Sequence, residues 1–294
     1  MMIRLGEFLD SFAGCFGRSA QRLAASRYVE GLLSEAPRKN MEGIWGRVSD
    51  PGDYQNLQHF ITHSRWEANG LWERLRERCP DRQGFLLIDD TGFPKQGEHS
   101  VGVQRQYSGT LGKIGNCQVA VSTVLRSQKS TWPLGMDLYL PRQWIEDPER
   151  RDRAGIPRQA RFREKGKIAL EQIDQALASG IAIECVLADA GYGDSSEFRE
   201  EIDARGLFYA VGVAGTAGAF ASEPHLLPPP QGARMGRPRT KWRRKKGSPK
   251  PRSLQKIARG LPEKAWKEIA WRKGSKGKLR GRFARLRVWP SHGW

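Results

Sequence analysis

Hydrophobic and polar positions follow three different patterns along this chain. From about residue 8 to residue 79, apolar side chains recur every three to five positions, which predicts helices. After residue 80 the apolar residues come in short unbroken runs bounded by glycine and polar residues, as is typical of buried strands. Beyond residue 214 the chain is polar and basic. We therefore predict a helical domain at 1–80, a strand-rich domain at 81–214 and a basic module at 215–294.

The middle region predicts a specific order of elements. Strands are expected at 85–89, 118–125 and 135–140, then a helix at 159–178, a strand at 183–189, a helix at 195–204 and a strand at 208–213. The expected core positions of the first helix are Ile168, Ile173 and Leu177. A glycine-rich loop is expected at 92–115, and its glycines do not have the spacing of a phosphate-binding loop. The order predicts an α/β domain with a mixed sheet.

The last region is expected to be a β-rich module with an unfolded stretch. Short strands are expected at 266–271 and 283–289, where apolar and polar residues alternate. Residues 228–252 begin with three prolines and are too charged and too poor in apolar side chains to fold alone, so we expect them to be disordered.

Two of the predicted strands end in carboxylates. The run 85–88 leads into Asp89 and Asp90, and the run 185–188 leads into Asp189. Ligands of open α/β sheets gather at the carboxyl ends of the strands, so Asp89 and Asp189 could meet in space. Two carboxylates in a cleft repel one another unless a cation lies between them or one is protonated. Hard oxygen ligands favour Mg²⁺ or Mn²⁺, which is the cofactor we predict.

Positive charge is concentrated at the end of the chain. The 294 residues carry a net charge of +18, and residues 234–294 alone contain 22 Lys and Arg against two acids. Such a cationic segment predicts a polyanionic partner, because neutralising phosphates releases counterions. A solubilising tail is the alternative, but five tryptophans in the same segment argue against it. The candidate DNA contacts are Lys95, His99, Arg237, Arg239, Lys241, Arg243, Arg244, Lys245 and Lys246.

Other classes of protein fit this sequence less well. No run of eighteen apolar residues occurs, so no membrane span is expected. The four cysteines are far apart, which suggests free thiols in a reducing cytoplasm rather than a zinc site or a disulfide framework. His59 and His63 lie four apart on a predicted helix, but no third ligand is near, so we expect surface residues. Tyr107 could stack on a base, although core packing is the preferred expectation.

Two motifs resemble one family. Residues 88–97, together with 100–103, 106–109 and 115–119, resemble the first-aspartate region of DDE insertion-sequence transposases. Residues 188–193, Ala-Asp-Ala-Gly-Tyr-Gly, resemble the second-aspartate motif of the same group. The similarity runs through most of residues 20–290, and the two motifs together are a specific signal. The resemblance implies a ribonuclease H-like core with a mixed sheet, interrupted by a β-rich insertion. The basic residues of the helical domain at 1–80 predict DNA binding there, with an ordinary charged helix surface as an equally good explanation.

The resemblance also implies a chemistry. In that family three acids hold two divalent metals, which activate water or a DNA 3′ hydroxyl for in-line attack on a phosphodiester. By resemblance Asp89 and Asp189 are the first two acids and the metal ligands. Because successive strand residues point to opposite faces, only one of Asp89 and Asp90 is expected to face the metals, and Asp90 stays open. DNA is the implied partner, and a homodimer working on paired ends is implied as well.

The third acid departs from the family pattern. A glutamate is expected on a helix after the insertion, within Tyr-x-x-Arg-x-x-x-Glu, and no such arrangement follows Asp189 before Trp294. We therefore expect that this polypeptide is truncated before the glutamate and does not complete catalysis alone. The main alternative is a noncatalytic DNA-binding remnant of a transposase. Phosphatases with an aspartyl nucleophile are disfavoured, since they need two acids separated by one residue.

Overall fold

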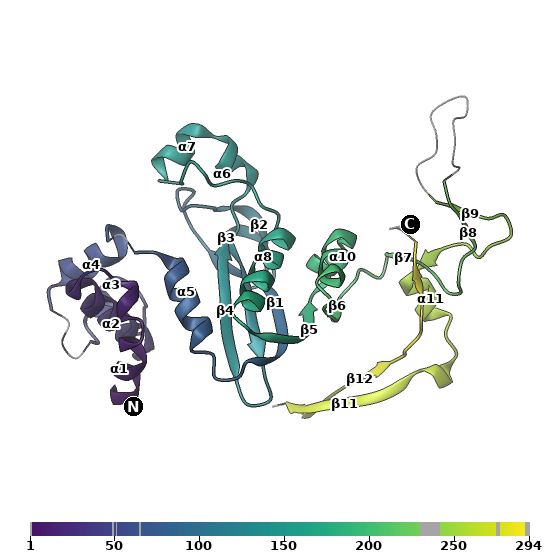
Figure 1. Cartoon of the computed structure of the whole chain (residues 1–294), viewed down its shortest axis with the longest axis horizontal. Coiled ribbons are helices and arrows are strands. Elements are labelled where there is room, and N and C mark those ends of the chain that lie inside the picture. The colour runs from purple at the N-terminus through teal and green to yellow at the C-terminus, as the bar shows by residue number, and fades with distance from the viewer. Residues whose placement is uncertain are drawn as a thin grey trace.

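The computed structural model describes residues 2–48, 50, 52–64, 66–229, 242–274 and 277–291. A helical segment, a layered α/β body and a strand-rich module follow one another along the long axis of the molecule (Figure 1). Arg237, Arg239 and Lys241 of the predicted DNA contacts lie outside the described residues.

The N-terminal segment is helical. Its helices are α1 (Met2–Asp10), η1 (Ala13–Cys15), α2 (Ser19–Leu33), α3 (Met41–Trp45), α4 (Tyr54–Thr62) and α5 (Ala68–Glu77). The side chain of Asp53 accepts a hydrogen bond from the backbone N–H of Gln55 and so begins α4. Leu57 and Phe60 are buried, as their spacing suggests. Arg76 fixes α5 to the body, because its buried guanidinium donates to the Leu134 carbonyl at 3.0 Å.

The body is built on a six-stranded mixed sheet. Its strands are β1 (Gln83–Pro94), β2 (Gln104–Ser108), β3 (Lys113–Arg126), β4 (Thr131–Leu138), β5 (Ala182–Ala188) and β6 (Tyr209–Val211). The order is β2-β3-β1-β5-β6, and β4 also pairs with β3. β1 runs antiparallel to β3 and parallel to β5. The predicted mixed sheet is confirmed, and the predicted strands follow one another in the expected order, with β2 as an additional strand.

One predicted loop is wrong. Residues 92–115 were expected to be irregular, but β1 extends to Pro94 and β2 pairs with the first residues of β3. Two of its glycines, Gly109 and Gly112, lie in the hairpin between β2 and β3, where Gly112 takes a positive φ of 63°.

Helices cover one face of this sheet. Helix α8 (Lys165–Ala178) lies on it, with Ile168 and Ile173 fully buried among sheet residues such as Leu86 and Val186. Helix α10 (Ser196–Ala204) adds Ile202 to the same core. The predicted helix begins at Lys165 rather than at residue 159, since the preceding residues are extended as far as Glu164. Two short helices, α6 (Arg142–Glu146) and α7 (Pro148–Arg153), follow β4.

The other face of the sheet has no helix on it among the described residues. Phe85 and Leu87 of β1 point there and are exposed, together with Met136 of β4 and Phe208 just before β6. Strands that pair in parallel are usually buried on both faces. All four residues of the run 85–88 are apolar, as in a strand that is buried on both faces, but only the face with Leu86 and Ile88 is covered here. We call this surface the open face.

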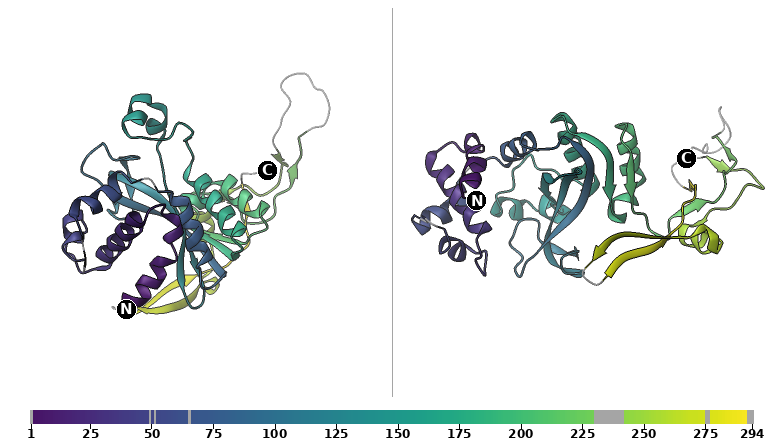
Figure 2. Two further views of the ribbon diagram at one scale, coloured as in Figure 1. Left: turned by 60° about the vertical axis from the view of Figure 1, so that its left-hand side comes forward. Right: turned by 90° about the horizontal axis from the view of Figure 1, so that it is seen from below.

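The C-terminal module consists of short strands and one arm. It contains β7 (Gly218–Phe220), β8 (Leu226–Leu227), β9 (Arg243–Arg244), β10 (Arg252–Ser253), α11 (Leu254–Arg259), η2 (Glu263–Ala265), β11 (Lys267–Gly274), β12 (Gly277–Phe283) and β13 (Trp289–Pro290). β10 and β13 both pair with β7, and β8 pairs with β9. β11 and β12 form a two-stranded arm that projects from the module (Figure 2).

Two predictions for this module need correction. Disorder over 228–252 is wrong for the described part, because Arg243–Arg244 pairs with β8; residues 230–241 of that stretch lie outside the described residues. The strand expected at 283–289 is also wrong, because β12 ends at Phe283. Gly274 pairs with Gly277, where φ is 118°, and this register between β11 and β12 sets the position of β12.

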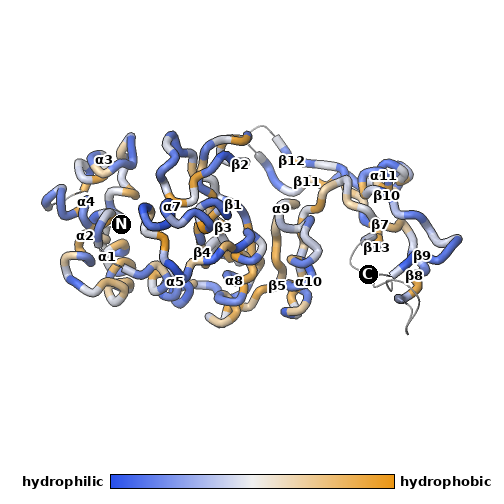
Figure 3. Tube along the Cα trace, turned by 90° about the horizontal axis from the view of Figure 1, so that it is seen from above, coloured by the Kyte–Doolittle hydropathy of each residue, from blue (hydrophilic) through white to orange (hydrophobic). Residues whose placement is uncertain are grey.

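Hydropathy follows this architecture. Figure 3 shows hydrophobic stretches along the body and the helical segment, whereas the β11–β12 arm is mostly hydrophilic. No helix in the described part of the chain is long and apolar enough to cross a membrane. All four cysteines are free.

Candidate metal centre at the tips of the parallel strands

The register of the sheet brings Asp89 and Asp189 together. Ile88 of β1 pairs with Ala188 of β5 in parallel, so the next residue on each chain segment is an aspartate. Neighbouring strands are about 4.8 Å apart. Both aspartates are exposed, on the side of the sheet opposite α8. They are therefore adjacent acids at one edge of the open face.

The oxygens of these two acids suit a cation. Asp89 Oδ1 accepts a hydrogen bond from the Asp90 N–H at 2.8 Å, and Asp189 Oδ1 accepts one from the Gly191 N–H at 2.9 Å. Neither Oδ2 atom has a hydrogen-bond partner in the described part of the chain, so one oxygen of each acid is available as a ligand. Exposed carboxylate oxygens on adjacent strands fit a hard divalent ion.

Glycines fix the backbone that carries Asp189. Asp189 is the N-cap of the short helix α9 (Ala190–Gly193), which lies against the end of β6. A Cβ at Gly193 would lie 2.0 Å from the Gly212 carbonyl oxygen, and a Cβ at Gly212 would lie 2.8 Å from the Ala190 nitrogen. No larger residue fits at either position without moving the backbone. Gly193 of the second motif therefore allows the close packing of α9 against the end of β6 that fixes the backbone of Asp189.

Asp90 has a different environment from Asp89. The Tyr192 hydroxyl donates to Asp90 Oδ1 at 2.6 Å, and the Lys165 ammonium group donates to Asp90 Oδ2 at 2.5 Å. Tyr192 is buried, and burial raises the pKa of its hydroxyl, with the charge of Asp90 as the second cause. Both oxygens of Asp90 are thus occupied by groups on the helix-covered side. Asp90 connects β1 with α8 and α9.

A third acid is not found beside the pair. Among the described residues, no group of three His, Cys, Asp or Glu side chains is placed to hold a metal ion. Glu263 and Glu268 lie in the module and pair with Arg282 and Arg280. His59 and His63 are exposed at the end of α4 and stack on each other, as expected for surface residues.

The predicted DNA contacts are mostly exposed but dispersed. Lys95 and His99 lie in the exposed segment after β1, and Lys95 is held by backbone hydrogen bonding to Asn116. Arg243, Lys245 and Lys246 are exposed, whereas Arg244 is half-buried and donates to the Ser248 carbonyl. Core packing of Tyr107 is wrong, since it is 64% exposed on β2.

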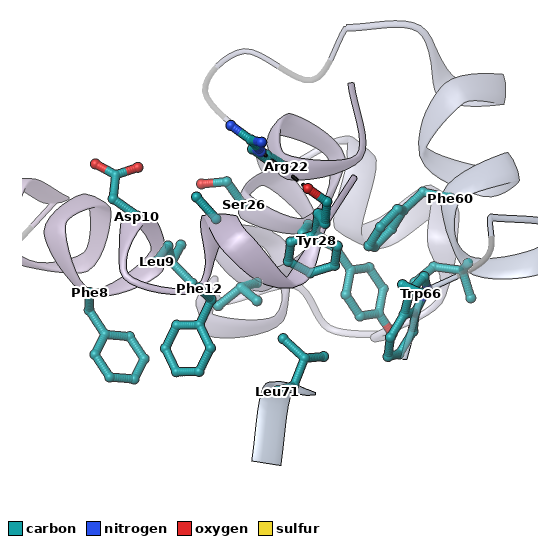
Figure 4. A pocket seen from close by; sticks show the side chains of 15 residues that line it. Phe8, Leu9, Asp10, Phe12, Arg22, Ser26, Tyr28, Phe60, Trp66 and Leu71 are labelled. Atoms are coloured by element: carbon teal, nitrogen blue, oxygen red, sulfur yellow. Dashed lines mark hydrogen bonds between the residues drawn. The ribbon is translucent and has the colours of Figure 1, made fainter. Parts of the chain in front are cut away.

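Sequence reasoning missed two features. One is the hydrogen bonding of Tyr192 and Lys165 to Asp90. Tyr192 belongs to the second motif and could have been suspected, whereas no motif includes Lys165. The other is a cavity of about 460 Å³ in the helical segment, lined by apolar side chains that include Phe12, Tyr28, Phe60 and Trp66 (Figure 4). Its lining comes entirely from residues 8–71, so it is separate from the acids.

The comparison with known families accords with this geometry. The sequence profile of the DDE superfamily endonucleases matches residues 11–278. The chain belongs to the DDE superfamily of endonucleases. The mixed sheet with its covering helices is accordingly the ribonuclease H-like core of that superfamily. Endonucleases of this superfamily generally use divalent metal ions.

One curated relative also resembles the chain. It is named "Probable transposase for insertion sequence element IS701", from Microchaete diplosiphon, and is 31% identical over 195 residues. The alignment covers 64% of this chain and 48% of the relative. The chain therefore spans about half the length of the curated relative that it matches.

Proposed function

We propose that this DDE superfamily endonuclease is the transposase of an insertion sequence, which cuts and joins DNA by metal-dependent phosphoryl transfer. The observation that carries the proposal is that Asp89 and Asp189 directly follow the paired residues Ile88 of β1 and Ala188 of β5, and that both carboxylates are exposed. The similarity to a transposase of an insertion sequence supports the same reaction.

Each residue has a defined part in this proposal. Asp89 and Asp189 would hold Mg²⁺ or Mn²⁺, which when bound supplies charge neutralisation for the phosphodiester and its attacking oxygen. The hydrogen bonds from the Asp90 and Gly191 N–H groups orient the carboxylates, so that one oxygen of each faces outward. Asp90 accepts hydrogen bonds from Tyr192 and Lys165, and these bonds connect β1 to α9 and to α8.

In this proposal, the third acid of the family pattern lies on an element that packs against the open face. Asp89 and Asp189 lie at the edge of that face, next to the exposed side chains of Phe85 and Leu87. An element that packs on these apolar residues brings its own side chains beside the two acids. We propose that such an element supplies the glutamate, and that the chain nicks DNA slowly when that element is absent.

Cleavage of DNA tests the proposal directly. Purified protein is incubated with supercoiled plasmid that carries the ends of its insertion sequence, in Mg²⁺, in Mn²⁺ and in EDTA. We expect metal-dependent nicking, which Asp89→Asn and Asp189→Asn abolish. Asp203→Asn, a matched change at an exposed acid on α10, should leave nicking intact. Nicking that persists in both variants would reject the assignment of these ligands.

A noncatalytic DNA-binding protein is the second candidate. The observation that favours it is the absence of a third acid beside Asp89 and Asp189 in the described part of the chain. Under this alternative the protein binds DNA in a salt-sensitive manner and never cuts it. Titration with Mn²⁺ separates the two, because only the catalytic candidate predicts metal binding that Asp89→Asn removes.

A further inference from the structure

The ladder between β1 and β5 ends just before the two acids. Ile88 and Ala188 are its last paired residues; beyond them β1 continues to Pro94, whereas the segment after β5 turns into α9. A parallel ladder fixes the distance between two strands only as far as its hydrogen bonds run. The spacing of Asp89 and Asp189 therefore depends on contacts that are made beyond the ladder.

Tyr192 makes such a contact. Its hydroxyl donates to Asp90 Oδ1 at 2.6 Å and so joins the segment after β5 to β1. Tyr192 lies three residues after Asp189, and its N–H donates to the Asp189 carbonyl at 3.3 Å. Its ring is buried and packs on Phe198 of α10, with centroids 5.6 Å apart. Because rings in a packed core have little freedom, the hydroxyl is a donor with a fixed position.

Asp90 transmits this contact to Asp89 through its backbone. The Asp90 N–H donates to Asp89 Oδ1 at 2.8 Å, while the Asp90 carboxylate accepts from Tyr192 and from Lys165. The rotamer of a side chain and the backbone angles of the same residue restrict each other. The carboxylate of Asp89 is thus oriented by a residue that is itself bonded to the segment of Asp189.

We propose that Tyr192 is a positioning residue of the metal centre, which acts through Asp90 to set the spacing of the Asp89 and Asp189 carboxylates for a divalent ion. This inference rests on the proposed function, since it takes the two acids as metal ligands. Mg²⁺ demands near-ideal geometry of its oxygen ligands, so the spacing of two carboxylates affects its binding. Groups that orient metal ligands typically change metal affinity by about 10- to 100-fold.

A purely structural role of Tyr192 is the alternative. Loss of its hydroxyl would then lower the stability of the fold and leave the metal affinity of the folded protein unchanged. Lys165 distinguishes the two roles, because it bonds the same carboxylate of Asp90 from α8 and does not connect the segments of Asp89 and Asp189. The positive charge of Lys165 also opposes a bound cation, so its removal favours metal binding.

Binding of Mn²⁺ to the full chain without DNA tests the proposal. Electron paramagnetic resonance measures free Mn²⁺ during a titration of the folded protein. Tyr192→Phe removes one hydroxyl and changes no charge, and we expect it to weaken Mn²⁺ binding about 10- to 100-fold. Lys165→Met also removes a hydrogen bond to Asp90, but we expect it to bind Mn²⁺ at least as tightly as the wild type does.

A core variant and a metal-free measurement complete the test. Ile202→Val changes a fully buried residue of the same core on α10, so it lowers stability and should leave Mn²⁺ affinity intact. Hydrogen exchange in EDTA follows the Asp90 N–H, which bonds Asp89. Tyr192→Phe should speed this exchange more than Ile202→Val does.

Two results would overturn this inference alone. They are a Mn²⁺ affinity of Tyr192→Phe within about twofold of a wild type that binds the metal, and equal losses of affinity in Tyr192→Phe and Ile202→Val. The second would show that affinity follows stability. A wild type that binds no Mn²⁺ would overturn the proposed metal centre together with this inference, so failure of the proposed function is distinguishable.

Discussion

Neighbouring aspartates have opposite environments on the two faces of the central sheet. On the face covered by α8, Asp90 has both oxygens occupied by Tyr192 and Lys165. On the open face, Asp89 and Asp189 lie exposed side by side, each with one oxygen free of hydrogen bonds in the described part of the chain. Two consecutive residues of β1 thus have different roles, Asp90 as a structural acid and Asp89 as a candidate metal ligand. They differ because successive side chains of a strand point to opposite faces.

The same contrast applies to the apolar residues of β1. Leu86 is fully buried under α8, whereas its neighbour Leu87 is 37% exposed on the open face. The covered face therefore contributes to the stability of the body as it stands, and the open face is available for contact. The next predictions test this division in order of decreasing effect.

The largest effect is expected from truncating β1 on its covered side. Leu86→Ala should lower the free energy of unfolding by about 2–5 kcal/mol, since it leaves a cavity in a packed core. Leu87→Ala should cost about 1 kcal/mol or less, because much of that side chain already contacts water. Urea titration followed by circular dichroism measures both. Equal losses would show that the open face is covered in solution.

A second contrast separates the two adjacent acids of β1. Asp89→Asn should reduce nicking more than about 100-fold, since even the residues behind a metal ligand typically contribute 10- to 100-fold. It should leave stability nearly unchanged, because Asp89 accepts its only side-chain hydrogen bond from the neighbouring backbone. Asp90→Asn should instead lower stability, since it removes the countercharge of Lys165. The reverse pattern in paired nicking and unfolding measurements would identify Asp90 as the ligand.

A smaller effect is expected at Tyr192. Tyr192→Phe removes a hydrogen bond to a charged acceptor and should cost about 1.5–3 kcal/mol at neutral pH. Folding raises the pKa of this hydroxyl above its ordinary value near 10, so its contribution is complete below pH 10 and is lost as the pH rises further. The wild type and the variant should therefore converge in stability in alkaline buffer. A constant difference between them across that range would contradict the assignment.

The smallest effect concerns the exposed side of the covering helices. Arg205, which follows α10, donates to Asp174 on α8 and lowers the pKa of that carboxyl. A lowered pKa stabilises the fold at neutral pH, and this contribution fades as the pH falls below about 4. Asp174→Asn should be slightly less stable than the wild type at pH 7, with the difference shrinking in acid. Asp152→Asn, on α7, is the matched control.

Several parts of the candidate site could be predicted from the sequence. The runs 85–88 and 185–188 predicted strands, and the register brings Asp89 and Asp189 side by side where the parallel pairing of β1 with β5 ends. Periodicity identified Ile168 and Ile173 as core residues of α8. These inferences worked because an unbroken apolar run has few ways to be buried.

Other parts depended on contacts between distant residues. Nothing near Asp90 in the sequence indicated its bonds to Lys165 and Tyr192, which are 75 and 102 residues away. The strand β2 was hidden by its polar residues, because its pairing with β3 rather than its own composition makes it a strand. The ring contact between Trp271 and Phe283 depends on the bulge at Trp271, which is a property of the pairing between β11 and β12.

The sequence by itself determined the apolar runs that form β1, β3 and β5, the apolar periodicity of α8, the acids that follow the runs of β1 and β5, and the place of the positive charge. These properties are local, since they depend on the order of apolar, polar and charged residues over a few positions. Only the tertiary structure decided which face of the sheet is covered, that Asp90 is held while Asp89 is free, and that two rings of the arm form one surface. Those outcomes follow from strand register and from which helix packs where, and both are set by contacts between residues far apart in the chain.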